Sequence, residues 1–458
     1  MDASLIRKYN VPGPRYTSYP TVPFWGDADL KEDPWMETLY RAVQESNAEE
    51  GISLYIHLPY CESLCTFCGC NKRITKKHEV ETPYIDSVLR EWERYTRLVR
   101  EATGQSLRVR EIHLGGGTPT FFSPDNLNRL ITGIESMAER CESFEYSIEG
   151  HPNNTRIDHL ETLYNLGFRR ISFGVQDYDE RVQLAINRIQ PFEKVEEVTS
   201  ASRKVGFESI SHDLVFGLPH QNEEGIRRTI EMTRQLMPDR IAYYSYAHVP
   251  WIKGVGQRGY ADEDLPKDEE KRRLYVIGKE LFEDAGYEEI GMDHFALRSD
   301  SLYKAVEGRT LHRNFMGYSA SATLAMVGLG VSSISDSWYG FAQNSKTVEE
   351  YQDWVDADRI PIFRGHLLNA EDLIIRRHIL NMMCQLQTSW EDPALQFPEL
   401  PDCLERLREM EEDGLLEISE NGLKVTEAGR PFVRNICMAF DLHLIRKKPT
   451  TRIFSMTV

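Results

Sequence analysis

The sequence predicts an α/β protein built on an incomplete parallel (β/α)6 barrel. From about residue 52 to residue 246, strand-like apolar segments alternate with helical ones, which is typical of a parallel sheet with right-handed crossovers. Six such units are fewer than a closed eight-fold barrel needs. Polar and glycine-rich motifs also follow the strand-like segments, and barrels of this kind place their sites at that edge. The predicted strands are 53–58, 110–114, 144–148, 168–175, 209–216 and 240–246.

Local signals support these elements in turn. The first strand, 53–58, is apolar and bounded by a glycine and a proline. A helix over about 84–100 is expected after it. Beyond the second strand, Ser123 is a favoured N-cap residue, and Pro124 suits the first position of a helix. Helical segments separate the remaining strands in the same way, so the pattern favours one continuous α/β unit.

Two regions of different composition flank the barrel. Residues 1–50 form a predicted amino-terminal arm or flap, because the glycine and prolines of the segment 13–20 disfavour a helix there. The barrel and its extension are assigned to residues 51–345. Residues 346–458 are predicted to form a mostly helical domain. Two of its helices precede a hairpin within 414–426, an order that is winged-helix-like.

The charge balance excludes some classes of partner. The chain has 458 residues, 41% of them hydrophobic, and a net charge of −18. Nucleic-acid binding normally needs a basic surface, so we expect no nucleic-acid partner. No apolar run approaches the roughly 20 residues of a membrane-spanning helix, and the chain begins without an apolar signal segment. We therefore expect a cytoplasmic protein with reduced cysteines and no membrane partner, and we expect a monomer.

Four of the eight cysteines fall within ten residues, just after the first strand. They are spaced C-x3-C-x2-C-x-C, at Cys61, Cys65, Cys68 and Cys70. Three thiolates from one short loop can hold an iron–sulfur cluster and leave one iron open for a ligand. Zinc, helped by His57 or His78, is the alternative, although zinc sites usually draw on two separated pairs. The other cysteines stand alone and are expected to be buried free thiols: Cys141, Cys384, Cys403 and Cys437.

Further polar groups stand at or beyond the ends of the predicted strands. The run Gly115–Thr120 permits close backbone approach and offers N–H groups to a carboxylate, although a glycine run alone is often a turn. Glu149 suits a cationic amino group, and its alternative is an exposed surface acid. Asp213 suits a ribose diol, and its alternative is a helix cap or a loop salt bridge. Gln176 and Arg188 are ambiguous in the same way.

The cysteine segment resembles the cluster motif of the radical S-adenosylmethionine (SAM) enzymes. In that superfamily the open iron chelates the amino and carboxylate groups of SAM, and an electron from the cluster splits SAM to a 5′-deoxyadenosyl radical. The same superfamily binds the methionyl part of SAM with a glycine run, which strengthens the interpretation of residues 115–120. The cofactors then carry the reaction, and the protein supplies binding and orientation.

Nearly the whole chain is similar to the oxygen-independent coproporphyrinogen III oxidases of haem biosynthesis. The similarity includes the segment 13–20 and the ending Cys70-Asn71-Lys72 of the cysteine loop. The other shared motifs are 115–120, 174–177, 291–296, 311–318 and 434–438. A related branch of haem chaperones looks similar around the barrel but generally lacks the Cys-Gly-Cys ending and the amino-terminal segment.

The resemblance implies one [4Fe–4S] cluster, held by Cys61, Cys65 and Cys68, and two SAM molecules. The first SAM would contact Tyr55, Gly116, Glu149 and Ile334. The second would contact Phe67, Gly117, Thr118, Gln176, Arg188, Asp213 and Ala247. Cys70 is expected to be important without being a ligand. Catalytic roles are expected for Cys70, Tyr55, Phe315 and Met316, of which the last two lie on the substrate side.

The implied reaction converts two propionates of coproporphyrinogen III to vinyl groups and gives protoporphyrinogen IX. A low-potential donor such as flavodoxin or ferredoxin would supply the electron. Because arginine suits bidentate recognition of carboxylates, we predict that Arg15 and Arg313 contact propionates. Both lie in shared motifs outside the set of residues expected to bind SAM.

Three positions depart from the pattern of this family. Met316 stands where glutamine is usual, so a thioether replaces a directional hydrogen-bonding group. Ser319-Ala320 stand where two threonines are usual, and Gly150-His151 stand where an acid normally precedes the proline. Two alternative functions stay open. One is a haem-binding chaperone that keeps the cluster without decarboxylating, and the other is a radical SAM enzyme that acts on haem itself.

Overall fold

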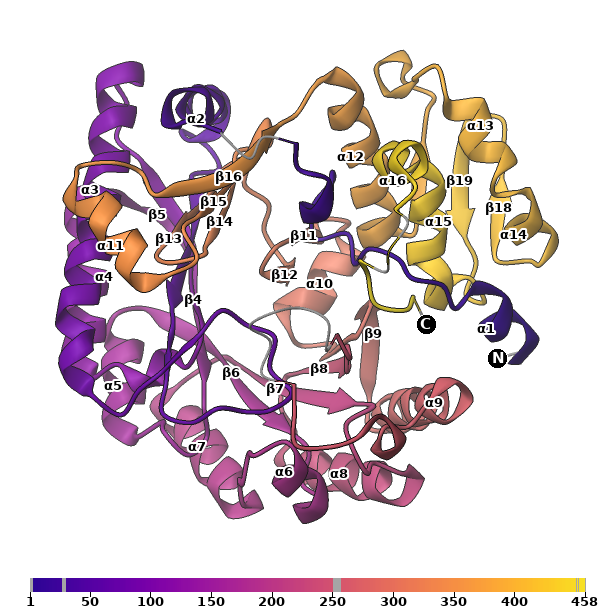
Figure 1. Cartoon of the computed structure of the whole chain (residues 1–458), viewed down its shortest axis with the longest axis horizontal. Helices are drawn as coiled ribbons and strands as arrows, with labels where there is room; N and C mark the ends of the chain where they lie inside the picture. The colour runs from indigo at the N-terminus through magenta and orange to yellow at the C-terminus, as the bar shows by residue number, and fades with distance from the viewer. Residues whose placement is uncertain (1–2, 27–29, 250–256, 450, 452, 458) are drawn as a thin grey trace.

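The computed structural model of the chain confirms the incomplete parallel barrel. It describes residues 3–26, 30–249, 257–449, 451 and 453–457. Six strands pair in parallel, each with the next: β1 (Ile52–Leu58), β4 (Arg108–Gly116), β5 (Glu139–Gly150), β6 (Phe168–Gln176), β7 (Ser209–Phe216) and β8 (Arg240–Ser245). The helices between them line the outside of the sheet in Figure 1: α3 (Glu81–Thr103), α4 (Pro124–Met137), α5 (Ile157–Asn165), α6 (Glu180–Ala185), α7 (Phe192–Val205) and α8 (Glu223–Leu236).

Local sequence explains how these helices begin and which face they bury. The Ser123 hydroxyl accepts a backbone N–H of the first turn of α4 at 3.3 Å, and a proline follows it, as predicted. Leu127, Leu130 and Ile134 recur at helical spacing and are fully buried in the main core. β1 is buried along most of its length, because it lies in the middle of the sheet.

Six further strands extend the barrel on both edges, and sequence patterning did not predict them. On one side they are β13 (Met326–Leu329), β14 (Ile334–Asp336), β15 (Gly340–Asn344) and β16 (Ile362–Leu367), and on the other β9 (Tyr287–Gly291) and β10 (His294–Leu297). The complete order is β16-β15-β14-β13-β1-β4-β5-β6-β7-β8-β10-β9. β13 continues the parallel part beside β1, and the others pair antiparallel. The sheet therefore reaches Leu367, beyond residue 345, where the sequence placed the end of the barrel.

Within the described part of residues 1–50, the chain forms two α-helices, α1 (Ala3–Tyr9) and α2 (Glu32–Ser46), and a short 3-10 helix at Val22–Phe24. α2 buries Trp35 and Leu39 in the main core beside the sheet. The segment 13–20 between the helices is not helical, as predicted. It runs toward the carboxy-terminal domain, where the Tyr16 hydroxyl donates to Asp441 Oδ2 at 3.1 Å. This part of the chain is thus packed on both sides rather than loosely attached.

The carboxy-terminal domain is mostly helical and lies at the upper right of Figure 1. Its helices are α12 (Ala370–Gln385), α13 (Leu400–Glu405), α14 (Arg408–Glu412), α15 (Val433–Phe440) and α16 (Leu442–Lys447). The predicted hairpin is formed by β18 (Leu416–Ile418) and β19 (Gly422–Val425), and β17 (Gln387–Ser389) adds a third strand. The remaining elements are β2 (Tyr60–Cys61), β3 (Arg73–Ile74), α9 (Asp268–Asp284), α10 (Ser301–Glu307), β11 (His312–Asn314), β12 (Gly317–Ser319) and α11 (Val348–Asp356). In the described part of the chain, no helix is long and apolar enough to span a membrane.

Glu91 of α3 fastens the unpredicted strands to the barrel. Its side chain is buried and accepts hydrogen bonds from the Gly330 amide at 2.8 Å, from Asn344 Nδ2 at 2.7 Å and from the Tyr351 hydroxyl at 2.7 Å. One carboxylate therefore satisfies three groups from the segment between β13 and α11. Burying such donors without a partner would cost free energy.

We expect Glu91→Ala to lower the free energy of unfolding by about 3 kcal/mol, because it leaves these three buried donors unpaired. The neighbouring Glu93 is exposed, and Glu93→Ala is expected to change the free energy by less than about 0.5 kcal/mol. Urea unfolding followed by circular dichroism measures both variants. Equal unfolding midpoints for the two would contradict the role of Glu91.

Candidate active site

The cysteine loop is ordered by contacts with the segment that follows α6. The Thr66 amide donates to the Ile186 carbonyl at 2.9 Å, and Asn187 Nδ2 donates to the Leu64 carbonyl at 2.7 Å. Pairing of β2 with β3 closes the loop at its base. The loop thus holds its four thiols at the carboxyl end of β1, the edge where the sequence predicted the site.

Donors and cations surround the thiols. Thr118 Oγ1 donates to Cys61 Sγ at 3.4 Å, and Arg188 Nη1 donates to Cys65 Sγ at 3.5 Å. A hydrogen bond from the Cys70 thiol, with the charge of Lys72, lowers the pKa of Cys68 to about 6. Burial instead raises the pKa of Cys61 to about 11. A nearby cation favours the thiolate form of a cysteine. Lys72 and Arg188 are such cations in this site.

The spread of the sulfur atoms distinguishes two kinds of centre. Among the described residues, no three cysteine sulfurs lie within 4.8 Å of one another. Two thiolates on one tetrahedral zinc are only about 3.8 Å apart, given the usual Zn–S distance. The loop is thus wider than a single zinc needs, and it suits a larger cluster with thiolates on different irons.

The glycine run packs directly on the cysteine loop. Gly116 has a φ of +120°, and a Cβ there would lie 2.8 Å from the His57 ring, while a Cβ on Gly117 would lie 2.6 Å from the Pro59 carbonyl oxygen. Only glycine fits both positions. The Gly117 amide donates to the Leu58 carbonyl at 2.9 Å, and the Gly116 amide donates to Glu149 Oε2 at 3.2 Å. The sequence predicted that these two backbone amides would bind a ligand, but both donate hydrogen bonds within the protein.

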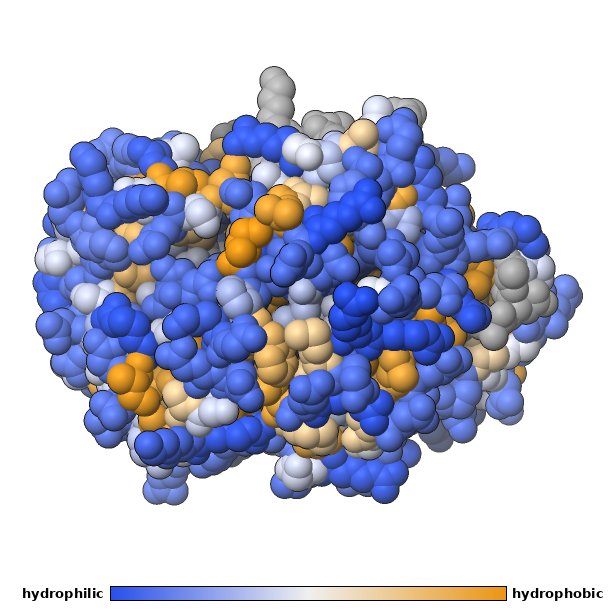
Figure 2. Space-filling view, turned by 90° about the horizontal axis from the view of Figure 1, so that it is seen from below, coloured by the Kyte–Doolittle hydropathy of each residue, from blue (hydrophilic) through white to orange (hydrophobic). Residues whose placement is uncertain are grey.

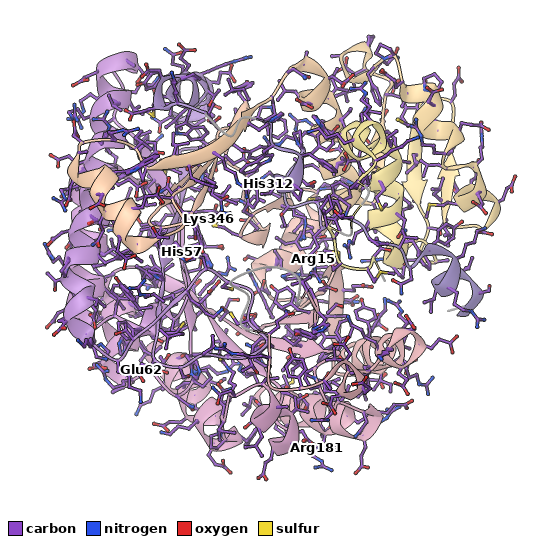
Figure 3. All side chains as sticks on the ribbon, in the orientation of Figure 1. Arg15, His57, Glu62, Arg181, His312 and Lys346 are labelled. Carbon is purple, nitrogen blue, oxygen red and sulfur yellow. The ribbon has the colours of Figure 1, made fainter. Side chains whose placement is uncertain are left out.

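A cavity of about 550 Å³ opens beside the loop. This size suits a small-molecule site. Seven of the predicted site residues line it: Tyr55, Cys70, Gly116, Glu149, Phe315, Met316 and Ile334. Figure 3 shows His57 and Lys346, which also line it, near one another, and Arg15 apart from them. We call this the main cavity.

Two histidines line the main cavity that the sequence did not assign to the SAM or substrate sites. His57 was considered only as a possible zinc ligand, and His113 was not considered. His57 Nε2 lies 2.9 Å from the Asn71 carbonyl, which can only accept, so Nε2 carries the proton and Nδ1 accepts from the Tyr55 hydroxyl at 3.0 Å. Burial lowers the pKa of His57, so the ring is neutral. His113 lies 2.8 Å from Ser147 Oγ and 3.4 Å from Glu149 Oε1. Side chains alternate between the two faces of a strand, so Tyr55 and His57 of β1 and His113 of β4 lie on one face of the sheet. This alternation was the sequence signal that could have identified the two histidines.

The residues predicted for a second SAM form another group around Cys65. Arg188 Nη2 donates to the Gly174 carbonyl at 2.5 Å. Gln257 Nε2 donates to the carbonyls of Ala247 at 2.7 Å and of Phe67 at 3.4 Å, which brings these distant residues together. Burial and the nearby charge of Glu149 raise the pKa of Asp213 to about 7, against the opposing effect of Arg188. Gln176 lies beside Arg188 and has a φ of +68°.

The two arginines predicted to bind substrate lie away from the main cavity. Arg15 Nη1 pairs with Asp293 Oδ2 at 3.0 Å and lines a second cavity of about 350 Å³ beside β9 and the carboxy-terminal domain. Arg313 is 5% exposed, stacks 4.5 Å from the centre of the Tyr318 ring and donates through Nη2 to the Arg15 carbonyl at 3.3 Å. Its Nε and Nη1 atoms have no hydrogen-bond partner within the described structure.

Comparison with known proteins decides the family. Residues 55–233 match the Radical SAM superfamily, and residues 368–432 match the HemN C-terminal domain. The oxygen-independent coproporphyrinogen III oxidase of Pseudomonas aeruginosa is 38% identical over 97% of this chain and 96% of its own length. This chain belongs to the oxygen-independent coproporphyrinogen III oxidase family.

Other members of the oxygen-independent coproporphyrinogen III oxidase family agree. The enzyme from Helicobacter pylori is 37% identical, with 97% of each chain covered. The solved structure of the Escherichia coli coproporphyrinogen III oxidase, a radical SAM enzyme, superposes with a TM-score of 0.88 at 34% identity over 97% of this chain and 99% of that one. Membership of the radical SAM superfamily means that the protein uses a [4Fe–4S] cluster and SAM, and the wide, donor-lined cysteine loop fits such a cluster.

We expect Cys61→Ser, Cys65→Ser and Cys68→Ser each to lose the cluster, because each thiolate is one of three protein ligands. Cys70→Ser should keep its iron yet lose turnover. Cys403→Ala removes a buried thiol of the carboxy-terminal domain and serves as the control that keeps both. Iron and sulfide analysis after anaerobic reconstitution measures the cluster. A full, reducible cluster in Cys61→Ser would show that the ligand assignment is wrong.

Proposed function

We propose that this protein decarboxylates two propionates of coproporphyrinogen III to vinyl groups without oxygen, giving protoporphyrinogen IX. The observation that carries the proposal is the main cavity. It joins the cysteine loop to Phe315 and Met316 at the tip of the β11–β12 hairpin, and its lining includes the cationic side chain of Lys346. The full-length similarity to enzymes named for this substrate supports the same conclusion. We further propose that the protein acts as a cytoplasmic monomer and accepts electrons from a flavodoxin or ferredoxin.

The cofactors would be held by the residues that the sequence selected. When bound, the cluster and SAM would supply the 5′-deoxyadenosyl radical. For each propionate, one hydrogen atom would pass from the carbon next to the ring to that radical, and the loss of carbon dioxide and of one electron to an electron acceptor would leave the vinyl group. Cys61, Cys65 and Cys68 would hold the cluster. Glu149 is oriented by the Gly116 amide at 3.2 Å and by His113 at 3.4 Å, so its carboxylate can take a cationic amino group. Tyr55, Gly116 and Ile334 line the same cavity and would complete the site of the first SAM.

Two SAM molecules per chain are proposed because the predicted residues fall into two groups. One group lines the main cavity. In the other, Arg188 donates to Cys65 and acts on Asp213 through its charge. Asp213 would accept hydrogen bonds from a ribose diol, a role that needs its carboxylate form. Gly117 and Thr118 are fixed to the cysteine loop between the two groups, since the Thr118 amide donates to the Tyr60 carbonyl at 3.0 Å.

An aromatic wall and two cations suit the tetrapyrrole. The Phe315 ring lies 6.1 Å from Trp25 and 5.9 Å from Phe341 between ring centres, both edge to face. Lys346 lines the main cavity, and burial together with the charge of Arg364 lowers the pKa of Lys346. Two cations that repel each other are stabilised when a carboxylate binds near both. We propose that Lys346 and Arg364 receive one propionate.

Arg15 and Arg313 remain our candidates for the other carboxylates. Arg313 is the stronger of the two, because a buried guanidinium with unpaired donors costs free energy until an anion reaches it. Arg15 already pairs with Asp293 and holds the Nη2 atom of Arg313 through its backbone carbonyl. Met316 at the hairpin tip offers a soft thioether where the family usually has glutamine, so it would contribute packing rather than a directional bond.

Asp213→Asn is expected to bind one SAM per chain where the unchanged protein binds two. Because the pKa of Asp213 is raised to about 7, its carboxylate form becomes dominant as the pH rises from 6 to 8, and the affinity of the second site should rise with it. The variant should lose this pH dependence and keep the cluster absorbance. Anaerobic equilibrium dialysis with labelled SAM measures both, and a single site in the unchanged protein would contradict the two-SAM proposal.

The activity itself is tested by anaerobic incubation of the reconstituted protein with coproporphyrinogen III, SAM and a low-potential reductant. Mass spectrometry should show the loss of two carboxyl groups and the divinyl product. If the protein binds haem tightly in one-to-one ratio and releases no carbon dioxide, it is a chaperone and the proposed reaction is wrong.

In the same assay, Lys346→Ala and Arg313→Ala should each lower kcat/KM by roughly 10- to 100-fold, the value of one lost charge-assisted hydrogen bond. Arg15→Ala should act in the same direction. Lys304→Ala, on the exposed face of α10, is the charge-matched control and should leave kcat/KM unchanged. SAM binding and iron content should stay normal in all four variants. Normal turnover in both Lys346→Ala and Arg313→Ala would show that the carboxylates are placed wrongly.

A further inference from the structure

Three side chains with metal-binding atoms converge far from the cysteine loop. They are His366 of β16, Asp372 in the first turn of α12 and His443 of α16. His366 Nε2 lies 3.4 Å from Asp372 Oδ2, and His443 Nε2 lies 2.7 Å from Asp372 Oδ1. All three ligand atoms fall within 4.8 Å of one another. We call this group the histidine–aspartate triad.

The carboxylate of the triad is positioned by the protein. Asp372 is fully buried, and the Asn369 amide donates to its Oδ2 atom at 3.2 Å. The first turn of α12 adds the positive end of a helix dipole, which favours the ionised form. The side chains of His366 and His443 are 13% and 20% exposed, so an ion from solvent can reach them. An oriented carboxylate between two accessible imidazoles is the arrangement that a metal ligand set requires.

We propose that the triad binds one divalent transition-metal ion, with Zn²⁺ as the best chemical match. Two imidazole nitrogens and one carboxylate oxygen form a common zinc ligand set, and water would complete a tetrahedral shell. Adjacent ligand atoms on such an ion are about 3.3 Å apart. The 3.4 Å from His366 Nε2 to Asp372 Oδ2 already has this value. The 2.7 Å of His443 Nε2 is measured to the other oxygen, Oδ1, so this imidazole must shift for both nitrogens to bind a metal held by Oδ2.

Zinc binding changes which ring nitrogen of the triad histidines carries the proton. Without metal, each Nε2 donates its proton to Asp372. His366 Nδ1 accepts the Gly26 amide at 3.4 Å, which agrees with that tautomer. Zinc at Nε2 requires the proton on Nδ1 instead, so the long contact with Gly26 is lost when the metal binds.

The position of the triad gives the ion a structural role. It would join the last strand of the large sheet to the first and last helices of the carboxy-terminal domain. The amino-terminal arm packs on the same point, since the ring of His443 lies 5.7 Å from Tyr19 and 6.5 Å from Phe24 between centres. None of these residues belongs to the main cavity or the cysteine loop.

The test uses the intact protein with its cluster, kept anaerobic and titrated with ZnCl₂. After desalting, metal analysis should find one zinc per chain in addition to the iron. Zinc-edge X-ray absorption should then show only nitrogen and oxygen ligands, at about 2.0–2.1 Å. A sulfur shell would place the zinc at the cysteines and would overturn the proposal, as would the absence of any retained zinc.

Substitutions of the two triad histidines test whether the zinc ion binds at the triad. His366→Asn and His443→Asn keep a side-chain donor for Asp372 but lose the imidazole, and each should raise the zinc Kd at least about tenfold. His220→Asn is the matched control, because His220 lies 3.4 Å from Asp264 in a pair that has no second imidazole within the described structure. If zinc binds equally to all three variants, or if the unchanged protein itself retains none, the triad is a hydrogen-bonded contact only.

Discussion

The site depends on the close approach of the end of β4 to the loop that follows β1. A side chain at Gly116 would collide with His57, and one at Gly117 would collide with the Pro59 carbonyl. Because both positions are glycine, the two backbones touch, and the amide of Gly117 bonds across the gap. This contact fixes Cys61 at the start of the cysteine loop and turns Glu149 toward the main cavity. Looser packing would separate the thiols from the cavity in which chemistry takes place.

A second constraint comes from both chain ends. The guanidinium of Arg434 is buried and donates to backbone carbonyls of Gly13, Pro14, Met456 and Thr457. Burial lowers its pKa to about 9, so its charge is held at a cost that these carbonyls offset. The carboxy-terminal domain therefore fixes the arm that carries Arg15. This is a scaffolding role for the carboxy-terminal domain.

Because the chain is acidic overall, the positions of its local cations indicate where an anionic substrate could bind. With a net charge of −18, the protein repels a polycarboxylate at long range, so any such substrate needs cations close to it. Lys346 lines the main cavity within range of the charge of Arg364, and Arg313 is buried with donors that have no hydrogen-bond partner in the described structure. Sequence motifs selected Arg313 but not Lys346, because Lys346 follows a short strand that has no periodic pattern.

The sequence alone determined the six parallel strands, the cysteine loop and the glycine run, because each is encoded by residues that are neighbours in the chain. Alternating burial in β6 and the cap at Ser123 are local in the same sense. Only the tertiary structure decided the contacts between elements that are far apart in the sequence. The strands β13–β16 are short. β13 pairs with β1, more than two hundred residues earlier in the chain, and β14–β16 join the large sheet only through β13. The triad of His366, Asp372 and His443 likewise exists only after three separate elements pack. Spacing along the chain carries no signal for contacts of this kind, since packing alone brings the residues together.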